Sequence, residues 1–274
     1  MPSAEPMVVG VHGTLDLRPE IRRAWETGEL DEDLYSLTVQ RAEAYGLTST
    51  VLGAGRPRGA RWAHNEAGGD WTQDGAVREI GYLQVDIADA TPDQPPPVRP
   101  AFTVLTDALR HVGSLTVAGV HVLAPPRPGA AGGEDLTWPD DESGGTSTET
   151  GAEVTVTLAT RDGGPAGRAQ RISEAVTDLS SGRLHLTPAP PESLDHAFPH
   201  PLTGTIHLVE AATGPGFRGR TPTWSLDMAV HIAETFLTAL GPYGTGPALV
   251  SGPALVSVAG PTVARPRGPI AGNG

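Results

Sequence analysis

Four polar residues of this chain lie where their side chains could act together as acids or bases. These residues are His12, Asp86, His185 and His207. Each alternates with apolar neighbours in a segment that is predicted to be a β-strand. Because successive side chains of a strand point to opposite faces, these residues are expected on the sheet face that helices leave uncovered. The expected strand order brings His12 near Asp86, and His185 near His207. A His–Asp pair can serve as an oriented general base, and two strand histidines can bind a metal ion. We therefore treat the four as candidate catalytic residues and, since the chain has no complete set of metal ligands, predict no metal or other cofactor.

Two glycine-rich segments in the second half of the chain, 161–168 and 214–219, carry or adjoin four arginines: Arg161, Arg168, Arg218 and Arg220. The second segment, 214–219, fits the pattern G-x-G-x-x-G. It does not qualify as a dinucleotide fingerprint, because Pro222 interrupts the expected helix start and no acidic residue ends the next strand. Both segments are predicted to be loops at the same end of neighbouring strands, beside helix N-termini. The arginines are therefore expected to converge into a site for a small anion.

Two short motifs, His12-x-Thr14 and His185-x-Thr187, resemble the paired His-x-Thr signatures of the 2H phosphoesterases, which are also two-lobed. The resemblance covers six residues and implies phosphodiester cleavage. In that family each motif follows a helix within its lobe, whereas His12 precedes a predicted helix, and the two motifs are further apart here. The resemblance therefore enters only as an enzyme alternative.

The elements that must position these residues repeat along the chain as strand, helix, strand. The predicted strands are 7–15, 48–52, 81–88, 115–123, 153–159, 183–187, 205–210 and one segment within 249–257. The predicted helices are 100–112, 168–179 and 224–240, with two short helices at 19–25 and 31–45 separated at Gly28. Two strand–helix–strand units make one ferredoxin-like sandwich, βαββαβ. We therefore expect an α+β fold of two tandem ferredoxin-like lobes, each with a mainly antiparallel sheet and helices on one face. The alternative is one mixed sheet with all helices on one side.

Composition suggests where the lobes begin and end. We predict a first lobe over residues 1–124, an acidic Gly/Ser/Pro-rich linker over 125–150, a second lobe over 151–260 and a flexible tail over 261–274. Residues 53–77, with Trp62 and Trp71, are predicted to be a long insertion. The hexapeptide Gly-Pro-Ala-Leu-Val-Ser occurs twice in succession from residue 246, and only one copy can form the last strand.

Charge and residue usage exclude several classes of function. The formal net charge of −13 over 274 residues argues against binding to nucleic acid or to an anionic membrane surface. The chain has no cysteine and no lysine, so thiolate, Schiff-base and Walker-type lysine chemistry are excluded. Neither a signal peptide nor an apolar run of about 20 residues is apparent, so a cytoplasmic protein is expected.

These observations favour a non-catalytic binding or assembly protein. Its partner would be a second copy of the chain or another protein, with a small anion as a further ligand. The alternative is a cofactor-independent enzyme, of hydrolase, phosphodiesterase or isomerase type, acting on a small anionic substrate. In that enzyme His12 or His185 would be the acid or base, Asp86 would orient it, and Arg218 and Arg220 would hold the anion.

Overall fold

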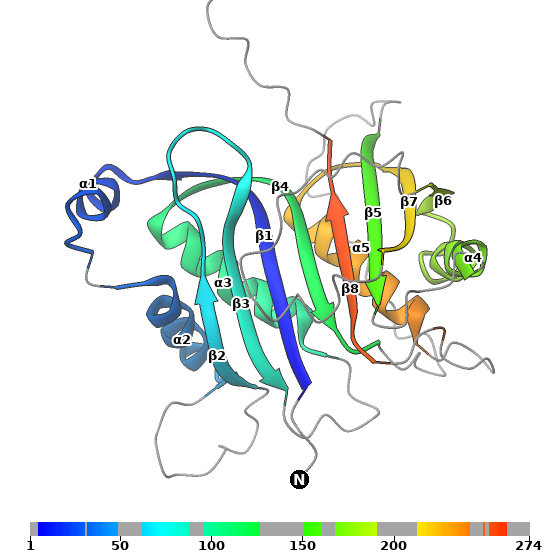
Figure 1. Ribbon diagram of the computed structural model, residues 1–274, viewed down its shortest axis with the longest axis horizontal. Helices are drawn as coiled ribbons and strands as arrows, with labels where there is room; N and C mark the ends of the chain where they lie inside the picture. Colours follow the sequence, from blue (N-terminus) through cyan, green and yellow to red (C-terminus); the bar gives the residue numbers. More distant parts are fainter. Residues whose placement is uncertain are drawn as a thin grey trace, which may run out of the picture.

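The computed structural model of the protein describes residues 5–30, 32–48, 62–87, 96–126, 151–160, 168–190, 213–241, 249 and 252–261. Within these residues it has eight strands and five helices (Figure 1). In chain order they are β1 (Glu5–Leu17), α1 (Pro19–Thr27), α2 (Leu34–Ala44), β2 (Ala63–Gly68), β3 (Arg78–Ile87), α3 (Val98–Val112), β4 (Gly113–Ala124), β5 (Ala152–Thr160), α4 (Ala169–Leu179), β6 (His185–Ala189), β7 (Thr213–Thr221), α5 (Leu226–Leu240) and β8 (Ala254–Ala259).

All eight strands belong to one sheet, in the order β2-β3-β1-β4-β8-β5-β7-β6. Every pair of neighbours is antiparallel. The prediction of an α+β fold with a mainly antiparallel sheet is therefore confirmed. The two halves of the chain do not have separate sheets, because β4 pairs with β8 from Gly119 opposite Ala259 to Ala124 opposite Ala254.

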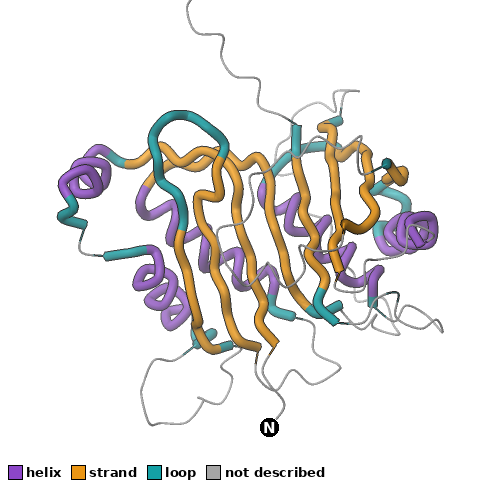
Figure 2. The backbone as a smooth tube through the Cα atoms, in the orientation of Figure 1, coloured by secondary structure: helices purple, strands orange, loops and turns teal. Residues whose placement is uncertain are grey.

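Helices α2 to α5 cover one face of this sheet, and α1 lies beyond its β2 edge (Figures 1 and 2). α3 packs on β1, β3 and β4, and α5 packs on β4 and β8, with α2 beside α3 and α4 beside α5. Alternate strand residues, such as Val9 and Val11, and the apolar stripe of α3 are buried in one hydrophobic core that runs through both halves. The side chain of Ser225 accepts a hydrogen bond from the Met228 amide at 3.1 Å and so begins α5. The short helices predicted on either side of Gly28 are confirmed, since Gly28 has a φ of 69° and ends α1.

The second strand differs from the prediction. β2 lies within the segment expected to be an insertion, whereas Thr48, the only described residue of the predicted strand 48–52, is not in a strand. β2 is an outer strand that pairs with β3 alone. An outer strand can carry polar residues on both faces, so the run His64-Asn65-Glu66 gave no alternating pattern to recognise.

The glycine-rich segment 214–219 is part of strand β7 and not a loop, which corrects the prediction. Its glycines allow neighbouring strands to approach. A Cβ at Gly214 would overlap the Leu158 carbonyl group, and one at Gly219 would overlap the His185 carbonyl group. The predicted strand 205–210 lies outside the described residues. The last strand, β8, uses the second copy of the repeated hexapeptide, and of the first copy only Leu249 is described, as a buried residue.

Candidate functional site

The predicted catalytic residue His12 is buried in a polar cluster on the sheet face opposite the helices. Its Nε2 atom lies 3.7 Å from Oε1 of Glu79. Its ring meets the ring of His121 edge to face, with 4.3 Å between the ring centroids. His121 Nδ1 in turn shares a hydrogen bond of 2.6 Å with Oγ of Ser257. We call His12, Glu79, His121 and Ser257 the histidine cluster.

Strand register brings these four residues together. His12 lies opposite Glu79 of β3, just after a register shift between Val11 and His12. His121 of β4 lies opposite Ser257 of β8, so the cluster crosses the junction between the two halves. Gly10 provides the space for the acid, because a Cβ at this position would overlap the Glu79 carboxylate. The cluster thus depends on four strands from both halves of the chain.

Burial lowers the pKa of both histidines of the cluster. It lowers the pKa of His121 to about 3. Burial, and secondarily the neighbouring His121, lowers the pKa of His12 well below its ordinary value. Both imidazoles are therefore neutral at pH 7. A neutral imidazole that shares a hydrogen bond with a hydroxyl is the arrangement by which a general base activates a serine nucleophile. However, Ser257 is only 8% exposed and the other three side chains are more deeply buried, which restricts access of a substrate.

The structure separates His12 from its predicted partner. Asp86 lies opposite Pro6, at the other end of the β1–β3 pair, and accepts a hydrogen bond of 3.3 Å from Asn65. The prediction that β1 and β3 are neighbours is confirmed, but in the actual register the acid beside His12 is Glu79. His185 is exposed on the outer strand β6, and its predicted partner, His207, lies outside the described residues.

The predicted anion-binding arginines are only partly brought together. Arg218 and Arg220 are exposed on the sheet face opposite the helices, since Phe217, which directly precedes Arg218 and points to the other face, is buried against Phe236 of α5. Arg220 lies opposite His185 and 3.5 Å from the Glu153 carboxylate. Arg168, in contrast, directly precedes α4 in the helix layer. Arg161 lies outside the described residues.

A polar pocket that sequence reasoning missed has a volume of about 560 Å³. Two arginines line it, and none of the described residues that line it is acidic. Arg18 Nη2 donates a hydrogen bond of 3.1 Å to the Arg110 carbonyl, which holds the two residues side by side. We call this the arginine pocket; it is lined by Arg18, Arg110, Gly113, Ser114, Leu115, Thr116, Val117, Trp224, Ser225 and Leu226. These residues come from three separate regions of the chain, so no sequence motif indicates the pocket.

Comparisons with known proteins returned no matching family model, curated protein or solved structure. In the part of the chain that the structure describes, no helix is long and apolar enough to cross a membrane. The same residues contain no group of three or more histidines and acids placed to hold a metal ion.

Proposed function

We propose that this protein is a non-catalytic binding or assembly protein, built from two ferredoxin-like halves, that binds a small anion. The strand order supports the two-half interpretation. Both halves have the strand order fourth-first-third-second, as β4-β1-β3-β2 in the first half and β8-β5-β7-β6 in the second. In each half, helical segments follow the first and third strands. In this interpretation the halves are joined edge to edge through their last strands.

The arginine pocket is the observation that carries the anion part of the proposal. Arg18 and Arg110 supply fixed positive charge, and the hydroxyl-bearing residues Ser114 and Thr116 supply further hydrogen-bond donors. The pocket lies on a chain of net charge −13. The surrounding field repels extended polyanions, so the ligand favoured here is compact, such as phosphate or a small carboxylate.

Millimolar phosphate or citrate is expected to raise the melting temperature by about 3 °C or more, because a ligand that binds only the folded state stabilises it by mass action. The double variant Arg18→Gln/Arg110→Gln should abolish this rise. Arg218→Gln/Arg220→Gln is the matched control, since it removes the same charge from two exposed arginines of the other candidate site. Differential scanning calorimetry measures the shift.

The two double variants show which pair of arginines binds the anion. If only Arg218→Gln/Arg220→Gln abolishes the rise, the anion binds at Arg218 and Arg220, two of the four arginines that the sequence predicts to hold it. If wild type shows no rise at all, the anion proposal is wrong. Light scattering tests the assembly part, and a strictly monomeric protein that also ignores anions would contradict the whole proposal.

The hydrogen bond between Ser257 and His121 favours one alternative, a hydrolase for small esters or phosphodiesters. A panel of such substrates should separate it from the binding function when wild type is compared with Ser257→Ala, His121→Ala and His185→Ala. We expect background turnover in all four proteins, because the histidine cluster is buried. Turnover by wild type that Ser257→Ala or His185→Ala loses would instead establish an enzyme.

A further inference from the structure

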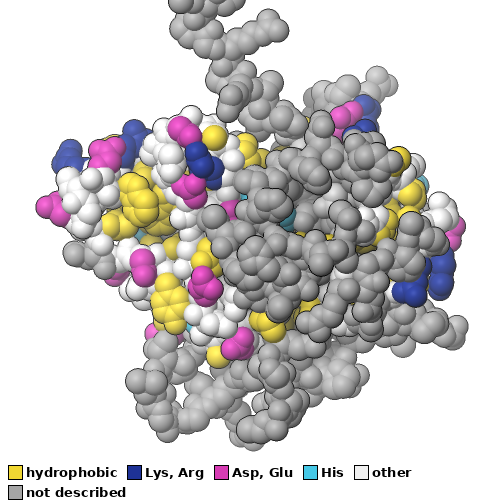
Figure 3. All heavy atoms as spheres, in the orientation of Figure 1, with side chains coloured by type: hydrophobic (Ala, Val, Ile, Leu, Met, Phe, Trp, Pro, Cys, Tyr) yellow, Lys and Arg dark blue, Asp and Glu magenta, His cyan; other side chains and the backbone are white. Residues whose placement is uncertain are grey.

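A second pocket, of about 380 Å³, lies between α1, the start of α2 and β2, away from the histidine cluster and the arginine pocket. Its walls are two indole rings and several apolar side chains, with two carboxylates among the lining residues. We call it the tryptophan pocket; it is lined by Trp25, Gly28, Leu30, Glu32, Asp33, Leu34, Ala67, Gly68, Gly69 and Trp71. In the space-filling view, hydrophobic side chains are exposed at the end of the molecule that carries α1 and α2, with acidic side chains close to them (Figure 3).

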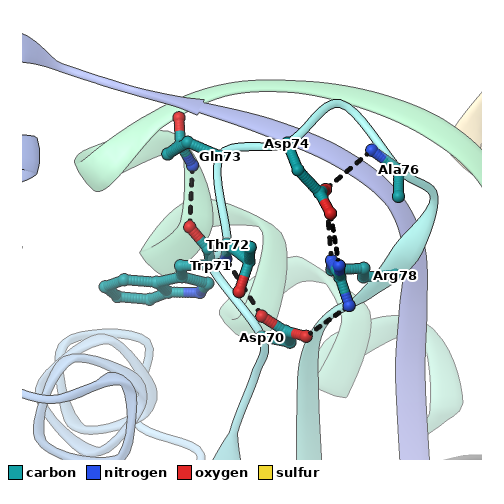
Figure 4. Close-up of polar contacts among 7 residues, drawn as sticks. All are labelled: Asp70, Trp71, Thr72, Gln73, Asp74, Ala76 and Arg78. Atoms are coloured by element: carbon teal, nitrogen blue, oxygen red, sulfur yellow. Dashed lines mark hydrogen bonds and ion pairs between the residues drawn. The ribbon is translucent and has the colours of Figure 1, made fainter.

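The loop between β2 and β3 holds Trp71 in place (Figure 4). Arg78 bridges two carboxylates, with Nη1 3.0 Å from Asp70 and Nη2 2.6 Å from Asp74. Gln73 donates a hydrogen bond of 2.8 Å to the Trp71 carbonyl. The indole Nε1 of Trp71 donates to the Ile80 carbonyl at 2.9 Å. The ring is therefore fixed before any ligand arrives, which lowers the entropy cost of binding.

Trp25 completes the aromatic wall from a different element. It lies on α1, and its ring centroid is 5.4 Å from that of Trp71, with the ring planes inclined at 45°. Trp71 is 3% exposed, whereas Trp25 is 46% exposed, so Trp71 forms the inner wall and Trp25 the outer one. At this distance the two rings pack on each other, so the exposed ring of Trp25 is the one that can offer a negative π-face to a cation.

The charge around the pocket matches such a ligand. Asp33 accepts a hydrogen bond of 2.8 Å from the Ser36 amide, and this bond lowers the pKa of its carboxyl group. Asp33 is therefore ionised at neutral pH. Glu32, a second acidic residue of the lining, accepts a hydrogen bond of 3.2 Å from Gln40 of α2. None of the described residues that line the pocket is basic.

We propose that the tryptophan pocket binds a small organic cation of the quaternary ammonium class. Indole faces and apolar side chains stabilise a weakly hydrated cation, whereas a metal ion would require oxygen or nitrogen ligands in place of its water. The two carboxylates balance the charge. This inference concerns a site separate from the arginine pocket and does not depend on the proposed anion.

Choline is the probe, and its neutral isostere 3,3-dimethylbutan-1-ol is the matched ligand control. Titration calorimetry should detect binding of choline and none of the alcohol at the same concentration. Trp25→Ala should weaken choline binding by roughly 5- to 30-fold, the range expected for loss of one cation–π contact. The double variant Glu32→Gln/Asp33→Asn should weaken choline binding more than Trp25→Ala does. It should not unfold α2, because asparagine also caps a helix.

Tyr45→Ala removes an exposed aromatic side chain outside the pocket and should leave choline affinity unchanged. Trp25→Phe, which keeps an aromatic face, should retain part of the affinity and serves if Trp25→Ala does not fold. Equal binding of choline and the alcohol would overturn the proposal. So would absence of choline binding, or unchanged affinity in the variants of Trp25 and of the two acids.

Discussion

Acidification from pH 7 to pH 5 is expected to lower the free energy of unfolding by about 2 kcal/mol for each histidine that is buried in its neutral form. When the pH falls below about 6.5, the ordinary pKa of histidine, the unfolded chain takes up a proton at His12 and at His121, and the folded chain does not. The unfolded state then binds more protons than the folded state, so the free energy of unfolding decreases as the pH decreases. The decrease ends at the pKa of the histidine in the folded state, which for His121 is about 3. His64 and His231, whose pKa burial lowers to about 4, add to the slope. Urea unfolding at fixed pH values between 7.5 and 5 measures it.

A pair of variants attributes this slope to the histidine cluster. His121→Gln should reduce the loss of stability between pH 7 and pH 5 by the share of one histidine, about 2 kcal/mol, whereas His185→Gln, at an exposed position of β6, should leave it unchanged. Carboxyl groups of ordinary pKa stay largely ionised down to pH 5, so they contribute little in this window. A stability that is flat between pH 7.5 and 5 would contradict the prediction, as would an unaltered slope in His121→Gln.

Replacement of Trp224 by alanine is expected to lower the free energy of unfolding by about 3 kcal/mol. Trp224 precedes α5 in the second half of the chain, but its Nε1 atom donates a hydrogen bond of 3.0 Å to the Val117 carbonyl of β4 in the first half. Its ring also lies against Gly260, where a Cβ would overlap it. The side chain therefore ties the two halves together at their junction. Chemical denaturation at constant pH measures the loss.

Trp224→Phe separates the two contributions of this residue. Phenylalanine keeps most of the ring contact with Gly260 and loses only the hydrogen bond to Val117, which should cost about 1 kcal/mol. A loss below about 1 kcal/mol for Trp224→Ala would show that the tie between the halves lies elsewhere in the β4–β8 junction.

The elements that sequence reasoning recovered are those with an apolar face in the core. The periodicity of α3 and the alternation in β5 reflect burial on one face, which the sequence records directly, whereas most residues of β1 and β3 are buried on both faces. β2 was missed because an outer strand needs no such pattern. The sequence predicts a loop at 214–219, within β7, because Gly and Pro are typical turn residues, whereas here glycine allows close approach of strands.

The candidate site was predicted less completely than the fold. Alternation placed His12 on the face without helices, but it cannot say how deeply that face is buried. The choice of Asp86 as its partner failed because a register shift at His12 brings Glu79 opposite it. His121 and Ser257 meet only through the pairing of β4 with β8, a contact between halves that no local pattern records.

The order of the central strands also determines how the protein responds to tension. β1 and β8 are each antiparallel to β4, which lies between them, so they run in the same direction. The chain enters β1 at one end of the sheet and leaves β8 at the opposite end (Figure 1). A force that pulls the start of β1 and the end of β8 apart therefore slides both strands along β4 in opposite senses. Because the hydrogen bonds of antiparallel strands are perpendicular to the strands, this force loads both ladders in shear, with many bonds strained at once instead of one after another.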